Sequence, residues 1–253
     1  NTTANNNTAV GSWALDANTT GDKNVGVGNS ALGSNTTGEF CTAVGYAALS
    51  TNNGNYNTGV GLNALLANTT GVGNVAFGSN ALDANTTAND NTAVGHVALT
   101  LNTTGAQNTA VGKGALSANT TASNNTAVGY HALDLNTTGT ANVAVGAGCL
   151  VANTTSSNNT AVGFEALNEN TTGQYNTAVG TYAITNGTTA ERNSAVGYGA
   201  GDAITTGSYN AGLGMGAMGG LTTGNYNTAI GYEALVAASN TAHDNTALGA
   251  RTL

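Results

Sequence analysis

The stretch "NTAVGHVALTLNTTGAQ" (residues 91–107) is followed directly by the closely similar "NTAVGKGALSANTTASN" (residues 108–124). The Gly of the "AVG" motif and its variants occurs fifteen times, at twelve intervals of 17 residues, one of 16 and one of 18. A short fixed period is typical of proteins built from stacked, similar units. We therefore predict a single β-solenoid repeat array over residues 1–253, and one interpretation makes it a segment of a longer fibre chain.

We write the repeat as "NTAVGxxALxxNTTGxx", number its positions from 1 to 17 starting at the leading Asn, and name each repeat a coil. Thr, Val and Ala at positions 2 to 4 favour a strand, and Gly at position 5 favours a bend. "NTTG" is typical of a turn, and a second short strand is expected around the Ala-Leu pair. Large apolar residues are too few for a helical stripe. The sequence predicts an all-β fold, a β-solenoid (parallel β-roll or β-helix) of about 15 coils with a 17-residue repeat.

The alternation of side chains along a strand predicts which positions fill the coil. Thr92 and Val94, at positions 2 and 4, are expected to face the interior together with Leu99 at position 9. The recurring Asn at positions 1 and 12 are expected to stack into ladders whose amides bond from coil to coil.

Position 3 is Ala in twelve coils and Gly in three, and the same alternation predicts that it faces outward. Its restriction to small residues predicts a close lateral contact with another copy of the chain, in a trimer or a filament. The alternative is that small residues fit a tight bend or a narrow second layer of the same coil. The candidate oligomer-interface residues are Ala43, Ala76, Ala93, Ala110, Ala127, Ala144, Ala161, Ala178 and Ala195.

The composition argues against two classes of partner. Charged residues make up 6% of the chain, and the formal net charge is −8 with only four cations. Nucleic acids and anionic membranes both attract clusters of Lys and Arg, so we expect neither as a partner. No run of 18 apolar residues occurs, so we also expect no direct membrane insertion.

The residues that could carry chemistry are scattered through the repeat. His96, His131 and His243 fall at different positions, and no metal-ligand spacing joins them to a Cys. The twelve carboxylates lie mostly at variable positions, which favours a solvated edge. Cys41 and Cys149 lie six coils apart, about 29 Å at ~4.8 Å per coil, which is beyond the reach of a disulfide. We predict no enzyme, no catalytic residue, no metal and no cofactor.

The sequence "NTT" occurs ten times, and each copy is formally an N-glycosylation acceptor. A ladder of turn Asn is the competing interpretation, and the repeat favours it. Tyr recurs at positions 6 and 17, where a ring can either stack on a sugar or cover the turn. The candidate glycosylation residues are Asn18, Asn35, Asn68, Asn85, Asn102, Asn119, Asn136, Asn153 and Asn170.

Three stretches carry a resemblance to a known family: "NTAVGYHAL" (125–133), "NVAVG" (142–146) and "NTAIGYEAL" (227–235). They resemble the head repeats of YadA-like trimeric autotransporter adhesins, and they are similar to the "NTAIGYxAL..NTTG" repeats of bacterial and phage tail-fibre proteins. Those adhesin heads are left-handed parallel β-rolls assembled as trimers. The resemblance therefore implies a trimer and a role in surface attachment.

These features favour a structural or adhesive segment of an extracellular fibre or filament, at the cell surface or on a virion fibre. The expected partners are further copies of the chain, with surface glycans or a host cell surface as adhesion targets. An ice-binding (antifreeze) solenoid and a carbohydrate-binding phage tail-fibre shaft are the alternatives. Adjacent Thr103 and Thr104 point to opposite sides, which predicts one outward Thr file instead of the paired Thr-x-Thr files of antifreeze solenoids. Where "GLGMGAMGGL" (212–221) departs from the repeat, a junction or contact surface is expected.

Overall fold

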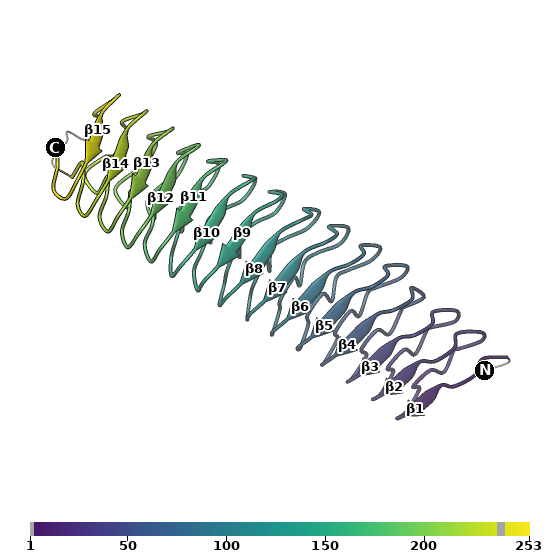
Figure 1. The fold of residues 1–253 in the computed structure, drawn as a ribbon. Coiled ribbons are helices and arrows are strands. Elements are labelled where there is room, and N and C mark those ends of the chain that lie inside the picture. The colour runs from purple at the N-terminus through teal and green to yellow at the C-terminus, as the bar shows by residue number, and fades with distance from the viewer. Residues whose placement is uncertain (1–2, 237–240) are drawn as a thin grey trace. The chain divides into compact units, whose positions relative to one another are not determined.

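The computed structural model describes residues 3–236 and 241–253, which belong to two compact units, Asn1–Asn125 and Thr126–Leu253. Within each unit the chain winds into a β-solenoid, in which each coil contributes one strand from positions 2 to 4 of the repeat. Figure 1 shows the strands of each unit side by side in the order of the sequence. The predicted all-β solenoid with a 17-residue repeat is confirmed, and the residues that the structure describes form no helix.

The strands are short and regular. The first unit contains β1 (Thr8–Val10), β2 (Val25–Val27), β3 (Thr42–Val44), β4 (Thr58–Val60), β5 (Val75–Phe77), β6 (Thr92–Val94) and β7 (Thr109–Val111). The second unit contains β8 (Thr126–Val128), β9 (Val143–Val145), β10 (Thr160–Val162), β11 (Thr177–Val179), β12 (Ser194–Val196), β13 (Ala211–Leu213), β14 (Thr228–Ile230) and β15 (Thr246–Leu248). Successive strands of a unit pair in parallel and in register, so that Ala93 lies opposite Ala110. Like residues therefore stack on like residues.

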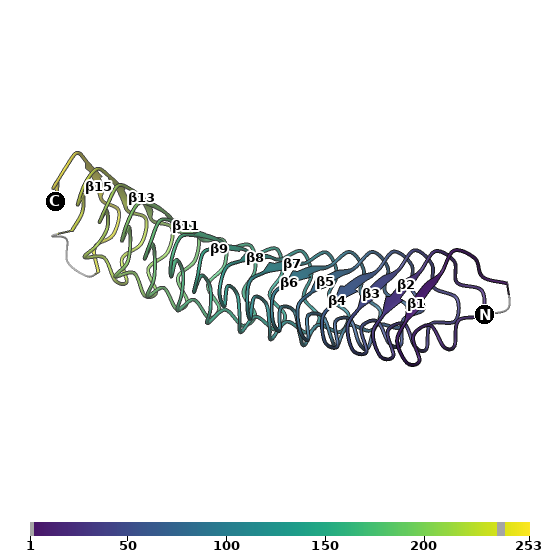
Figure 2. The same cartoon turned by 90° about the horizontal axis from the view of Figure 1, so that it is seen from below.

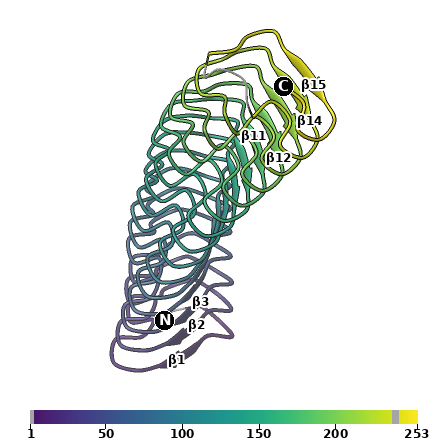
Figure 3. The same ribbon diagram turned by 90° about the vertical axis from the view of Figure 1, so that its left-hand side faces the viewer.

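The interior of each coil is narrow, and Leu at position 9 supplies its main apolar file. In the coil at residues 91–107, Ala93, Ala98 and Leu99 are fully buried, and Asn91 and Asn102 are buried with them. Burial of a Leu side chain contributes about 1.5–3 kcal/mol, so the repeated Leu is a large apolar contribution to each coil. Figure 3 shows that successive coils of a unit follow the same closed path around this interior.

The strands face the opposite way from the prediction. Ala93 at position 3 is fully buried, whereas Thr92 and Val94 at positions 2 and 4 are partly exposed. The predicted alternation of side chains is confirmed, but the predicted inward positions face outward. Leu at position 9 fills the coil and leaves room only for a small side chain at position 3. A Cβ added to Gly59 at position 3 would lie 3.2 Å from Leu49 Cγ. Only a methyl group or a hydrogen fits there, so the larger Thr and Val point outward.

Backbone conformation closes the coil. Gly95 at position 5 has a φ of 135°, which confirms the predicted bend at a conformation that favours glycine. Val97 and Leu99 have φ values of 53° and 52°, and these left-handed residues interrupt an extended strand. The predicted second strand around the Ala-Leu pair is therefore wrong for the described coils. Bonding between coils continues there, because the Leu99 N–H donates to the Ala115 carbonyl at 3.0 Å. Figure 2 shows these connections repeating along each unit.

The core of the second unit changes composition near its C-terminal end. Coil 193–209 has Gly201 at position 9, where the other coils have Leu, Ile or Met, and Ile204 at position 12, where most have Asn. A Cβ added to Gly201 would lie 2.9 Å from Ile204 Cδ1, so Ile204 occupies the space that a side chain at position 9 fills elsewhere. In the next coil Met218 occupies position 9 itself and packs against Gly212 at position 3. Ile204, Met218 and Leu221 are fully buried, so the apolar interior continues with different residues.

Candidate interaction surfaces

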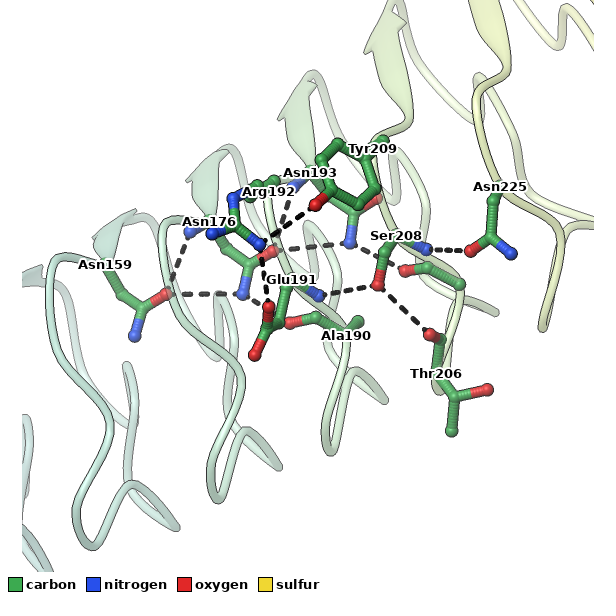
Figure 4. A network of polar contacts seen from close by, with 11 residues as sticks. Asn159, Asn176, Ala190, Glu191, Arg192, Asn193, Thr206, Ser208, Tyr209 and Asn225 are labelled. Carbon is green, nitrogen blue, oxygen red and sulfur yellow. Dashed lines mark hydrogen bonds and ion pairs between the residues drawn. The ribbon is translucent and has the colours of Figure 1, made fainter. Parts of the chain in front are cut away.

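The Asn at position 1 joins each coil to its neighbour and bridges its own coil. In Figure 4 the Asn176 N–H donates to Asn159 Oδ1 at 2.9 Å, and the Asn193 N–H donates to Asn176 Oδ1 at 3.0 Å. The side-chain amide of Asn176 also donates to the carbonyl of Ala190, at position 15 of its own coil, at 2.7 Å. Each of these Asn thus uses both ends of its amide inside the solenoid.

The Asn at position 12 meets this first file at a shared acceptor. The Gly105 carbonyl accepts from Nδ2 of Asn91 and from Nδ2 of Asn102, both at 2.9 Å. Asn102 Nδ2 also donates to Asn85 Oδ1 at 3.1 Å. Because a buried polar group left without a partner costs about 1–3 kcal/mol, this pairing makes buried Asn compatible with the core. The predicted Asn ladders are confirmed.

The candidate glycosylation residues all belong to the position-12 file. Their side chains are 0 or 1% exposed, so the folded chain leaves no amide nitrogen of this set accessible to a glycosyl donor. This burial contradicts glycosylation of the folded protein and supports the ladder interpretation. The residues concerned are Asn18, Asn35, Asn68, Asn85, Asn102, Asn119, Asn136, Asn153 and Asn170.

The candidate oligomer-interface alanines are also buried. Each has 0% exposure within a single chain, so none can touch a second copy. The small-residue restriction has the alternative cause, a narrow layer inside the same coil, and the prediction of an outward Ala face is wrong. The residues concerned are Ala43, Ala76, Ala93, Ala110, Ala127, Ala144, Ala161, Ala178 and Ala195.

The residues at positions 2 and 4 form the outer surface of the sheet, which we call the strand face of each unit. Its members are Thr, Val, Ser, Ala, Phe, Leu and Ile, so the described strands carry no charge at all. Val10, Phe77 and Leu213 are 57%, 57% and 52% exposed. In the second unit a shallow apolar groove of about 230 Å³ crosses β12 to β14, lined in part by Val196, Leu213 and Ile230. The strand face is therefore an uncharged, partly apolar surface open to solvent.

Position 17 carries a column of stacked side chains in the second unit. The Arg192 guanidinium lies 5.1 Å from the centre of the Tyr175 ring and 5.3 Å from that of Tyr209. Tyr209 stacks on Tyr226 with ring centres 5.0 Å apart. Arg192 also donates to the Tyr209 hydroxyl at 3.1 Å (Figure 4). Tyr209 therefore lies between Arg192 and Tyr226, which favours a role in covering the turn over stacking on sugars for this ring.

The two cysteines are buried free thiols, as the coil spacing predicts. Cys41 takes the place of the Asn at position 1, and its Sγ donates to the Gly54 carbonyl at 3.2 Å. Burial raises the pKa of Cys41 and of Cys149 above the ordinary thiol value, which disfavours the reactive thiolate. Both thiols therefore act as small core groups.

Across residues 3–236 and 241–253, no group of three or more His, Cys, Asp or Glu side chains is placed to hold a metal ion. His131 Nδ1 lies 2.6 Å from Asp134 Oδ2, within one coil. Among the described residues, none forms a helix with the length and apolar character that crossing a bilayer requires.

Together, the fold and these surfaces define a β-solenoid repeat protein with ladders of buried Asn and an uncharged strand face. Comparison of the chain with models of protein families finds no model that matches it. Comparison with curated proteins finds no match either.

Proposed function

We propose that the chain is a structural segment of an extracellular fibre, at a cell surface or on a virion, and that copies associate laterally through the strand face. The strand face is the observation that carries the proposal. Parallel sheets are usually covered on both faces, and here a single chain covers only the inner one. The resemblance to adhesin-head and tail-fibre repeats supports the surface location and a role in attachment.

The chemistry of the strand face favours contact with a second copy. Two sheets pack at about 10 Å, and each Å² of apolar surface removed from water contributes about 25 cal/mol. The strands carry no charge, so an ion need not be desolvated when two faces meet. The contribution of one coil is small, and it repeats along the in-register strands. Lateral association is therefore expected to strengthen with the number of coils in contact.

A charge placed on the strand face tests the proposal. In Val94→Lys the side chain points outward, so the core residues Ala93 and Leu99 keep their contacts. Gln107→Lys adds the same charge to the same coil at exposed position 17, where Lys23 already has a φ of 57°, close to the 60° of Gln107. Analytical ultracentrifugation over a range of concentrations is expected to show oligomers for the wild type and for Gln107→Lys, and a shift to monomer for Val94→Lys.

Two results would contradict lateral association through this face. One is a wild-type chain that sediments as a monomer up to millimolar concentration. The other is an equal change in association for both Lys variants, which would mean that net charge acts and the strand face does not. Circular dichroism of both variants checks that the solenoid is folded. Electron microscopy of the wild type then distinguishes a closed trimer from a filament.

A second candidate function, ice binding, is favoured by the outward-facing side chains of the strands and not by the turns. Thr104 is exposed and Thr103 is half-buried, with its hydroxyl donating to the Thr120 carbonyl at 3.1 Å, so the turn presents one exposed Thr file. The strands, however, present Thr92 and Val94 two residues apart on the same outward face. This gives regular paired files of Thr and Val. Measurable thermal hysteresis that Val94→Lys abolishes is the expected result for this candidate, and its absence at millimolar protein removes it.

A further inference from the structure

The second unit has an open hollow of about 270 Å³ at the surface of coils 193–209 and 210–226. It includes part of residues 212–221, the stretch that departs from the repeat. Three glycines create it: Gly199 and Gly216 at position 7, and Gly219 at position 10. Gly199 and Gly216 have φ values of 58° and 64°, close to the 52° of Glu165 at the same position in another coil. The backbone conformation at position 7 is thus similar in these coils. The hollow lies where other coils have side chains at positions 7 and 10.

The carboxylate of Asp202 borders this hollow. A Cβ added to Gly199 would lie 3.5 Å from Asp202 Oδ2, and a Cβ added to Gly219 would lie 3.7 Å from Asp202 Oδ1. Both oxygens therefore border the hollow. Partial burial raises the pKa of Asp202, and N–H groups of Ala203 and of Asp202 itself oppose the shift. Among the ion pairs of the described residues, none includes Asp202.

Glu233, Tyr198 and Met215 also line the hollow. Glu233 lines the hollow, but Arg251 Nε lies 3.0 Å from Glu233 Oε2 and balances that charge. Tyr198 and Met215 occupy position 6 of their coils and are 58% and 47% exposed. The rings of Tyr198 and Tyr182 pack edge to face with their centres 5.9 Å apart, which restrains the orientation of Tyr198. An aromatic ring and a thioether beside a carboxylate that belongs to none of these ion pairs attract an organic cation.

We propose that this hollow binds a primary alkylammonium group, with Asp202 accepting from the ammonium and with Tyr198 and Met215 contacting the alkyl chain. A free amine and the side chain of a lysine share this chemistry. The overall charge of −8 attracts either cation toward the chain. The site uses positions 6, 7 and 10 of the repeat, whereas the strand face uses positions 2 and 4, so ligand binding and lateral association are tested separately.

The two methionines of the chain provide the readout. Met215 lines the hollow and Met218 is fully buried, so protein labelled with ¹³C at the Met methyl groups has one reporter and one internal reference. The full chain is titrated with n-butylammonium chloride and, separately, with n-butanol at equal ionic strength. The expected result is a saturable shift of the Met215 methyl signal with the amine at millimolar concentration, while Met218 is unchanged. Butanol is expected to leave both signals in place.

Three variants sharpen the test. Asp202→Asn is expected to weaken amine binding about fivefold, the scale of a partly exposed ion pair. Asp16→Asn removes the same charge at position 10 of a coil in the first unit and is expected to bind as the wild type does. Gly199→Ala is expected to weaken binding by filling the hollow, because its added Cβ meets Asp202 Oδ2 at an ordinary contact distance of 3.5 Å.

Titration with Nα-acetyl-lysine methylamide and with its norleucine counterpart identifies the source of the cation. Binding of the lysine compound supports a lysine side chain as ligand, and binding of butylammonium alone supports a free amine. Equal shifts with butanol, no Met215 shift up to about 100 mM amine, or unchanged binding by Asp202→Asn would each overturn the proposal. None of these outcomes bears on self-association.

Discussion

The bend at position 5 yields the sharpest prediction, because two glycines of one coil provide both the perturbation and its control. Gly146, at position 5, has a φ of 139°, and an added Cβ would lie 2.4 Å from the Gly163 carbonyl oxygen and 2.9 Å from Cys149 Sγ. Gly148, at position 7, has a φ of 70°, and an added Cβ would lie 3.1 Å from Glu165 Cγ, on a flexible side chain. Both residues change to Ala in the test.

The expected magnitudes differ because the two sites differ in strain and in space. For Gly146→Ala the backbone strain costs about 1–3 kcal/mol, and displacing the next coil costs about 1–3 kcal/mol more. For Gly148→Ala the left-handed conformation costs about 1–2 kcal/mol, and the reduced freedom of the unfolded chain returns about 0.4–1 kcal/mol. The gain from reduced freedom of the unfolded chain applies to both variants. We therefore expect Gly146→Ala to lower the free energy of unfolding by about 1–5.5 kcal/mol, and Gly148→Ala by no more than about 1.5 kcal/mol.

Urea unfolding followed by circular dichroism measures the difference, and amide hydrogen exchange shows whether the loss is centred on the coil at residues 142–158. Exchange is needed because neighbouring coils of a solenoid can open locally without global unfolding. Equal unfolding midpoints for the two variants would contradict the predicted difference between positions 5 and 7. So would a loss of protection centred far from Gly146.

Three further predictions concern the core. Leu99→Ala is expected to lower the free energy of unfolding by about 2–5 kcal/mol, whereas Leu101→Ala, 53% exposed in the same coil, is expected to change it by less than about 0.5 kcal/mol in thermal unfolding. Asn74→Ala removes the oxygen that accepts from the Asn91 N–H at 3.0 Å, and a loss of about 1–3 kcal/mol in urea unfolding is expected. Burial raises the pKa of Cys41, so the unfolded chain loses the thiol proton first, and stability is expected to fall as the pH rises above the ordinary thiol value of about 8.5. Cys41→Asn, which restores the position-1 residue, is expected to remove that part of the alkaline loss when the free energy of unfolding is measured between pH 7 and pH 10.

The sequence was most informative where a physical requirement recurs in every coil. The 17-residue period, the bend at Gly95 and the burial of Leu99 follow from the pattern, because stacking places like residues together. The ladders that include Asn102 follow as well, since buried amides need partners. The predicted second strand is wrong because Leu99 has a left-handed backbone conformation, which its residue type does not indicate.

The repeat alone predicts a β-solenoid with Asn ladders, whereas the side of each strand that forms the surface follows from the packing inside the coil. Alternation makes Ala93 face away from Thr92 and Val94, but it does not say which of them faces the core. The Leu side chain inside the coil settles it: at Gly59, an added methyl group would already lie 3.2 Å from Leu49 Cγ. The restricted alanines therefore line the interior, and the variable Thr and Val form the outer surface of the sheet.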